Sequence, residues 1–106
     1  GDLAFFDNTY DRDRDGRWND ELTHVALVLE VEEDGTIVLA HGGTSRGRTT
    51  LRMHLGRPGE RADGDQILND YLRARGKRDP KKAVYLAGQL WRGFATLPIE
   101  AVVEVP

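Results

Sequence analysis

The segment from His24 to His41 constrains the fold of this chain more than any other part of the sequence. It contains two runs rich in aliphatic and β-branched residues, HVALVLEV over His24–Val31 and TIVLAH over Thr36–His41. The intervening EEDG carries Asp34-Gly35, a pair that is typical of tight turns between antiparallel strands. The sequence therefore predicts a β-hairpin here, and an antiparallel sheet built around it.

Shorter patterns on both sides of the hairpin extend the predicted sheet. Leu3–Phe6 is a short apolar run that we expect to form a buried strand, and residues 7–22 are polar and loop-like. Thr49–Met53 is expected to form a further long strand, and Ile99–Val105 alternates well enough for a final one.

Two helices are predicted late in the chain. Ile67, Leu68, Tyr71 and Leu72 fall at helical spacing, and Gly76 is a suitable helix stop. Asp79-Pro80 then resembles a helix start. The apolar stripe of this second helix consists of Val84, Ala87, Leu90, Trp91 and Phe94. We therefore expect an α+β fold: an antiparallel β-sheet with two C-terminal helices.

Composition excludes several classes of protein. The 106 residues suffice for a single domain, and the absence of cysteine excludes disulfides, thiolate metal sites and a thiol nucleophile within the chain. The net charge of −3, with no concentrated basic run, argues against nucleic acid as a partner. No apolar run is long enough to predict a membrane span. The abrupt start at Gly1, without methionine, predicts that residues 1–106 are a fragment of a longer chain.

An acidic loop lies between the first two predicted strands. In DRDRDG, the residues Asp11, Asp13, Asp15 and Gly16 fit positions 1, 3, 5 and 6 of a calcium-binding loop. Oxygen ligands at alternate residues can wrap a hard cation, and glycine permits the sharp turn that follows. The sequence therefore predicts a calcium site that also fixes the start of the strand at His24.

The later positions of this loop match only in part. The backbone carbonyl of Arg17 and the side chain of Asn19 fit the next ligand positions, whereas Leu22 replaces the closing glutamate. Asp20 and Glu21 can supply the closing carboxylate instead. The alternative is a solvated acidic loop without a metal, neutralised by Arg12, Arg14 and Arg17.

The two histidines of the hairpin form a second candidate site. An even number of loop residues, such as Glu32–Gly35, would place His24 and His41 on the same face, with their rings about 5–8 Å apart. An unbulged loop of three residues would place them on opposite faces. The pair then has two interpretations: hydrogen-bonded histidines at the margin of a sheet, or a general base whose tautomer is fixed by a second polar group. A metal site built from both rings lacks an evident third ligand.

Three stretches of this sequence together resemble papain-like cell-wall peptidases and amidases, the NlpC-like and CHAP families. These are GDLAFF at the start, the strand that opens with HVALV, and the hairpin partner that ends at His41. The match covers about residues 1–45, and the DRDRDG insertion is not a general feature of those families. The resemblance implies a papain-like β-core in which His24 is the general base and His41 is the residue that orients it.

The resemblance also implies where the chemistry is incomplete. In those families the nucleophile is a cysteine at the start of a helix that precedes the GD strand, and this chain has no cysteine. The chain would therefore be the histidine-bearing part of a bacterial cysteine hydrolase that acts on peptidoglycan-like amide bonds or peptides. It would be inactive alone and would need an N-terminal segment or a partner chain. A secreted, periplasmic or cell-envelope location is implied as well.

Two other functions remain open on the sequence. One is a catalytically inert, calcium-stabilised relative that binds a peptide or glycan in the same cleft. The other is an interaction domain whose exposed strand edge accepts a partner segment. An upstream cysteine would favour the enzyme, binding without turnover would favour the first alternative, and a stoichiometric partner would favour the second.

Overall fold

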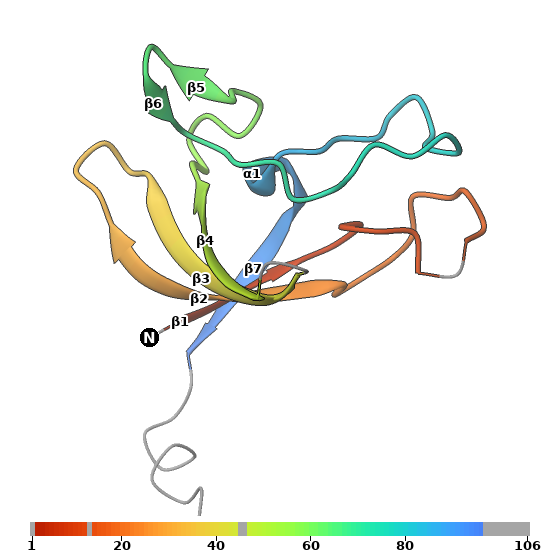
Figure 1. Ribbon diagram of the computed structural model, residues 1–106, viewed down its shortest axis with the longest axis horizontal. Helices are drawn as coiled ribbons and strands as arrows, with labels where there is room; N and C mark the ends of the chain where they lie inside the picture. The colour runs from red at the N-terminus through yellow and green to blue at the C-terminus, as the bar shows by residue number, and fades with distance from the viewer. Residues whose placement is uncertain (1, 13, 45–46, 97–106) are drawn as a thin grey trace, which may run out of the picture.

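A computed structural model describes residues 2–12, 14–44 and 47–96. Five strands form one antiparallel sheet in the order β4-β3-β2-β1-β7 (Figure 1). Their bounds are β1 Asp2–Phe6, β2 His24–Val31, β3 Ile37–Thr44, β4 Gly47–Met53 and β7 Trp91–Thr96. A small hairpin of β5 Ala62–Asp63 and β6 Gln66–Ile67 stands apart from the sheet, and α1 spans Ala87–Leu90.

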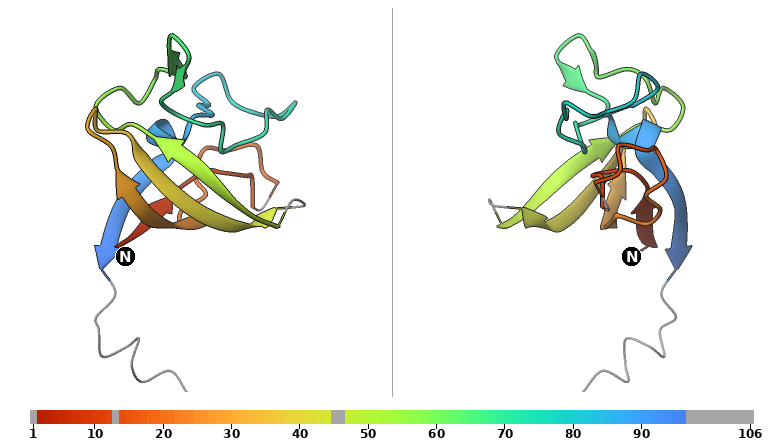
Figure 2. Two further views of the ribbon diagram at one scale, coloured as in Figure 1. Left: turned by 60° about the vertical axis from the view of Figure 1, so that its left-hand side comes forward. Right: turned by 90° about the vertical axis from the view of Figure 1, so that its right-hand side faces the viewer.

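The sheet is a meander with one returning strand. β2, β3 and β4 follow one another as antiparallel neighbours, whereas β1 lies between β2 and the last strand, β7. Figures 1 and 2 show the long connection between β4 and β7, together with α1, on one face of this sheet. The sheet and hairpin predictions are therefore confirmed for the strands from 2 to 53, while the predicted strand Ile99–Val105 lies outside the described residues.

The predicted α+β class with two C-terminal helices is wrong. Among the described residues there is one short helix, α1, and residues 67–72 are not helical. The amide of Leu72 instead donates to the carbonyl of Tyr85 at 2.9 Å, and that of Ala87 donates to Asp70 at 2.9 Å. The segment thus runs alongside a later part of the chain and exchanges backbone hydrogen bonds with it. Apolar residues at helical spacing fit this arrangement too, because Leu68 is buried while Tyr71 is exposed.

Asn69 is the physical reason why this segment does not form a helix. Its side chain is fully buried, and its Oδ1 accepts hydrogen bonds from the amides of His54 and Gly88. Its Nδ2 donates to the carbonyls of Arg57 and Glu60. An asparagine that saturates four distant backbone groups outweighs the weak local preference for a helix.

The second predicted helix is likewise wrong over most of its length. Only Ala87–Leu90 is helical. Val84 lies in the irregular segment before it, and Trp91 and Phe94 belong to β7, where Trp91 pairs with Phe6 of β1. Pairing with β7 satisfies the backbone groups along the otherwise free edge of β1, so tertiary pairing decides the conformation. Asp79 does not begin a helix, because its carboxylate binds Arg73, the amide of Gly76 and the hydroxyl of Tyr85.

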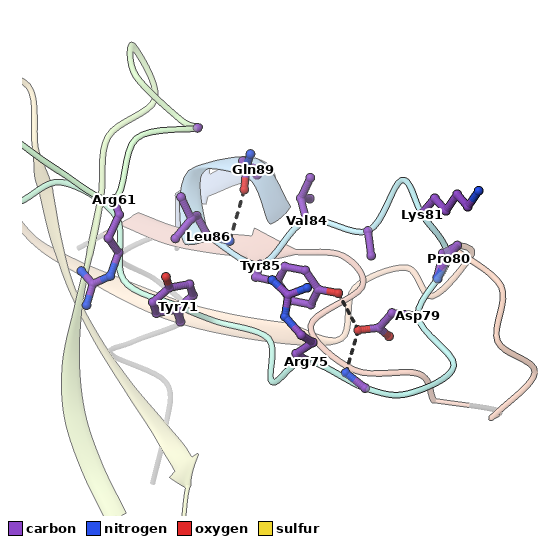
Figure 3. A pocket seen from close by; sticks show the side chains of 13 residues that line it. Arg61, Tyr71, Arg75, Asp79, Pro80, Lys81, Val84, Tyr85, Leu86 and Gln89 are labelled. Atoms are coloured by element: carbon purple, nitrogen blue, oxygen red, sulfur yellow. Dashed lines mark hydrogen bonds between the residues drawn. The ribbon is translucent and has the colours of Figure 1, made fainter.

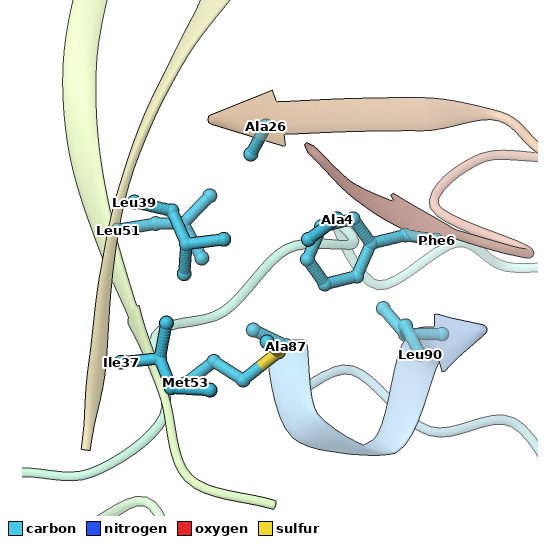
Figure 4. Close-up of a cluster of buried hydrophobic side chains, with 9 residues drawn as sticks. All are labelled: Ala4, Phe6, Ala26, Ile37, Leu39, Leu51, Met53, Ala87 and Leu90. Carbon is cyan, nitrogen blue, oxygen red and sulfur yellow. The ribbon is translucent and has the colours of Figure 1, made fainter. Parts of the chain in front are cut away.

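The hydrophobic core lies between the inner face of the sheet and α1 (Figure 4). Its nine buried side chains come from every long strand except β7, and from the helix: Ala4, Phe6, Ala26, Ile37, Leu39, Leu51, Met53, Ala87 and Leu90. This is the same face that carries the predicted histidine pair, because Phe6 pairs with His24 and Ala26 lies two residues further along β2. No helix in the described parts of the chain is both long and apolar enough to cross a membrane.

Candidate functional site

The β2–β3 hairpin places its two histidines on one face, by a route that differs from the predicted one. Val31 pairs with Ile37, so five residues separate the paired ends, and Gly35 occupies the left-handed region with φ +94°. In an unbulged hairpin, this odd number of loop residues would place the two histidines on opposite faces of the sheet. A bulge between Val28 and Glu30 adds one residue to β2 and restores the parity, so that Leu27 pairs with Ala40.

The two rings meet in a direct hydrogen bond. Nε2 of His24 lies 2.9 Å from Nδ1 of His41, with ring centroids 5.0 Å apart and the planes at 85°. Nε2 of His41 in turn lies 2.9 Å from Oγ1 of Thr49, the residue directly opposite on β4. The three side chains therefore form a linear relay across three neighbouring strands.

This relay has one protonation pattern that leaves a base at its free end. If His41 donates from Nε2 to the Thr49 hydroxyl, its Nδ1 must accept from Nε2–H of His24. Nδ1 of His24 is then an unprotonated nitrogen, and no described residue forms a hydrogen bond with it. The reverse pattern, in which Thr49 donates, would place a proton on that nitrogen. In the first pattern Nδ1 of His24 can accept a proton, and in the reverse pattern it already holds one.

Burial lowers the pKa of both rings and so favours their neutral forms. Burial lowers the pKa of His24 below its usual 6.5, and the neighbouring charge of His41 lowers it further. Burial also lowers the pKa of His41, against the opposing effect of Asp70. Two adjacent imidazoles cannot both accept charge easily, so the pair is poised as a neutral base rather than as a cation.

The relay opens onto a hollow of about 500 Å³. Its lining combines the loop before β2, the two histidines and the segment after β6: Thr9, Tyr10, Thr23, His24, His41, Gly42, Tyr71 and Leu72. We call this hollow the histidine groove. Thr9 and Thr23 are tied to each other through their hydroxyls at 2.6 Å, which fixes one wall of the groove.

A second hollow, of about 640 Å³, adjoins the groove at Tyr71, which lines both (Figure 3). Two arginines stack on tyrosines that line it: the guanidinium of Arg61 on Tyr71 at 4.9 Å, and that of Arg75 on Tyr85 at 4.6 Å. Lys81 adds a third positive charge to the lining, and Asp79 is its one acidic side chain. We call this the basic hollow.

The acidic loop brings together three of the predicted calcium ligands. Carboxylate oxygens of Asp11, Asp15 and Asp20 all lie within 4.8 Å of one another. Gly16 has φ +73°, as the predicted sharp turn requires, and its amide donates to Asp11 at 2.8 Å. Asp13 lies outside the described residues.

The other predicted ligands behave differently. The carboxylate of Glu21 is turned towards Arg92, 3.6 Å away, and its side chain is 72% exposed, so Asp20 alone takes the closing position. The side-chain amide nitrogen of Asn19 donates to Asp15 at 3.3 Å, and the backbone amide of Arg17 donates to Asp15 at 2.9 Å.

Three contacts in and around the site escaped sequence reasoning. Thr49 completes the relay, but its role depends on the β3–β4 register. His54 is buried, and its Nε2 lies 2.8 Å from the carbonyl of Asp34, which ties the hairpin turn to the end of β4. Arg73 is buried and paired with Asp79.

Comparison with known proteins gives no relative on which a function could rest. The chain matches no protein-family model, no curated protein and no solved structure. The function must therefore be argued from the site itself.

Proposed function

We propose that this chain carries the general base of a hydrolase that cleaves amide bonds through a cysteine thiolate. The observation that carries the proposal is the hydrogen bond between Nε2 of His24 and Nδ1 of His41, continued to Thr49. This hydrogen bond fixes the orientation of the His24 ring and leaves its Nδ1 available for proton transfer. Since the chain has no cysteine, the thiol comes from outside these 106 residues.

Each residue of the relay has a defined part in this chemistry. Nδ1 of His24 takes the proton of the thiol, and the thiolate attacks the carbonyl carbon of the amide. The resulting imidazolium donates its proton to the departing amine as the C–N bond breaks, which leaves a thioester. His24 then takes a proton from water as the water oxygen attacks the thioester. As the C–S bond breaks, the imidazolium returns that proton to the sulfur, which releases the thiol and a carboxylic acid. His41 is a positioning residue that accepts from Nε2–H of His24 throughout.

The basic hollow supports a substrate that extends beyond the bond being cleaved. Because Tyr71 borders both hollows, a peptide seated at His24 can continue over its ring towards Arg75 and Lys81. Positive charge at that end suits a peptide that carries carboxylates. Together with the resemblance to cell-wall amidases, this favours peptidoglycan-like peptides as the substrate class and the cell envelope as the place of action.

One observation favours a second candidate, a binding domain without catalysis. The groove and the basic hollow are both formed by a chain that contains no cysteine. A peptide could therefore be bound here without being cleaved.

An assay on the full-length gene product distinguishes the two. We expect hydrolysis of peptidoglycan-derived peptides that iodoacetamide abolishes, and a loss of about 10²- to 10⁴-fold in kcat for His24→Ala, the usual contribution of a general base. His41→Ala should lower kcat less and move its pH profile. As a matched control, His54→Gln keeps a donor for the carbonyl of Asp34 and should leave kcat unchanged. Peptide binding without turnover in the wild type would overturn the enzyme and select the binding domain.

A further inference from the structure

The acidic loop contains a buried charge that nothing in the described chain compensates. Asp20 is only 5% exposed, and its Oδ2 is buried without a hydrogen-bond partner among the described residues. Oδ1 of Asp11 is in the same state. A carboxylate removed from water costs several kcal/mol unless it is paired or binds a metal.

The nearby arginines do not supply the missing charge. Arg12, which the sequence offered as a neutralising partner, donates instead to the backbone carbonyls of Glu21 and Leu22, at 2.6 and 3.1 Å. Within the described ranges, no ion pair joins Asp11 or Asp20 to a basic side chain. The negative charge of Asp11 and Asp20 is therefore left without a cationic partner among the described residues.

The spacing of the carboxylates identifies the class of cation. The three ligand oxygens lie within 4.8 Å of one another. Two oxygens that bind one Ca²⁺ at about 2.3–2.6 Å can be at most about 5 Å apart, so all three fit one coordination sphere. An all-oxygen set of three carboxylates on a loop, completed by water or backbone oxygens, suits a hard divalent cation of variable geometry.

We propose that Asp11, Asp15 and Asp20 bind one divalent cation of the calcium class, and that this ion fixes one wall of the histidine groove. A short chain of hydrogen bonds connects Asp20 to this wall. The carbonyl of Asp20 accepts from the backbone amide of Asn8 at 2.7 Å, and the amide of Asp20 donates to the side-chain Oδ1 of Asn8 at 2.9 Å. Thr9, the next residue, lines the groove and is held by Thr23, the residue before His24.

The site differs from the calcium loop that the sequence suggested. In that loop a glutamate at the twelfth position closes the coordination sphere, whereas here Asp20 occupies the tenth position and points inwards. Leu22, at the twelfth position, is exposed and has φ +51°. A cation bound by Asp20 holds together the two ends of the loop, which flank β1 and β2. It therefore acts on the groove and not on the outer tip of the loop.

Calorimetric titration of the chelator-treated chain with CaCl₂ tests the binding. We expect one ion per chain, and Tb³⁺ should bind competitively with luminescence sensitised by Trp18 of the same loop. Asp20→Asn should weaken Ca²⁺ binding by at least about 10-fold. The matched control, Asp65→Asn, removes the same charge from an exposed turn and should bind as the wild type does.

Two further readouts keep the proposal falsifiable if a variant is unstable. Without metal, Asp20→Asn should melt at or above the temperature of the wild type, because the amide removes an uncompensated buried charge. In amide NMR spectra, Ca²⁺ should shift the signals of Thr9 and Thr23. The absence of binding up to 10 mM Ca²⁺, or equal binding by Asp20→Asn, would overturn the site. Binding without shifts at Thr9 and Thr23 would overturn its action on the groove.

Discussion

Replacement of Asn69 by alanine tests how the connection between β6 and α1 is held in place. The buried amide makes four hydrogen bonds to the backbones of His54, Gly88, Arg57 and Glu60, at distances of 2.8 to 3.0 Å. Each such bond contributes about 1 kcal/mol net, and a backbone group left buried without a partner costs about 1–3 kcal/mol. Asn69→Ala should therefore lower the free energy of unfolding by about 4 kcal/mol, a large share of the total of a small domain.

Urea unfolding followed by tryptophan fluorescence measures this loss. Gln66→Ala is the matched control, because it removes an exposed amide that makes one hydrogen bond to Asp34 and should cost less than about 1 kcal/mol. Asn69→Asp keeps the acceptor oxygens but loses both donors. Its stability should recover in part as the pH falls, because a protonated carboxyl donates one hydrogen bond. A loss below about 1 kcal/mol for Asn69→Ala would refute this account of the connection.

Three further predictions follow from individual contacts. The hydrogen bond from Arg73 holds the pKa of Asp79 at about 2, against 3.8; the resulting stabilisation, about 2 kcal/mol, is present above pH 4 and lost as the pH falls towards 2. Urea midpoints between pH 5 and 2 should show this loss, and Asp79→Asn should remove it. Because burial lowers the pKa of His24 and His41, stability should also decline as the pH falls below 6.5; a double exchange to glutamine that shows the same decline would contradict this. Gly35→Ala should cost about 1 kcal/mol in thermal unfolding because φ is +94°, whereas Gly42→Ala, whose Cβ meets nothing within 4 Å, should cost less than about 0.5 kcal/mol.

The strands could be predicted because their signal is local. His24–Val31 is a run of aliphatic residues that ends at a turn, and its bounds in the structure are those predicted. The helices failed because apolar spacing does not distinguish a helix from an extended segment with one buried side. At Asn69 a buried amide decided the outcome, and at Trp91 the free edge of β1 decided it. Both are contacts between residues far apart in the sequence.

The residues of the candidate site could likewise be named from the sequence, but the contacts that bring them together could not. An even number of loop residues would have placed His24 and His41 on one face; the loop has five residues, and the two share a face because of a bulge at Leu29 that no local signal marks. Asp20 and Glu21 are adjacent and chemically alike, and the position of Arg92 across the loop separates their roles. Sequence pattern indicated which residues to consider, and tertiary contacts decided which of them meet.

The protonation state of the two hairpin histidines tests the central claim most directly. Long-range ¹H–¹⁵N NMR of the imidazole nitrogens reports it in this chain, without any nucleophile. We predict that both rings are neutral at pH 7, that each carries its proton on Nε2, and that each titrates below 6.5. Thr49→Val should disturb the tautomer of His41 before that of His24. Rings that titrate like free imidazole, with the proton exchanging between both nitrogens, would contradict the proposed base.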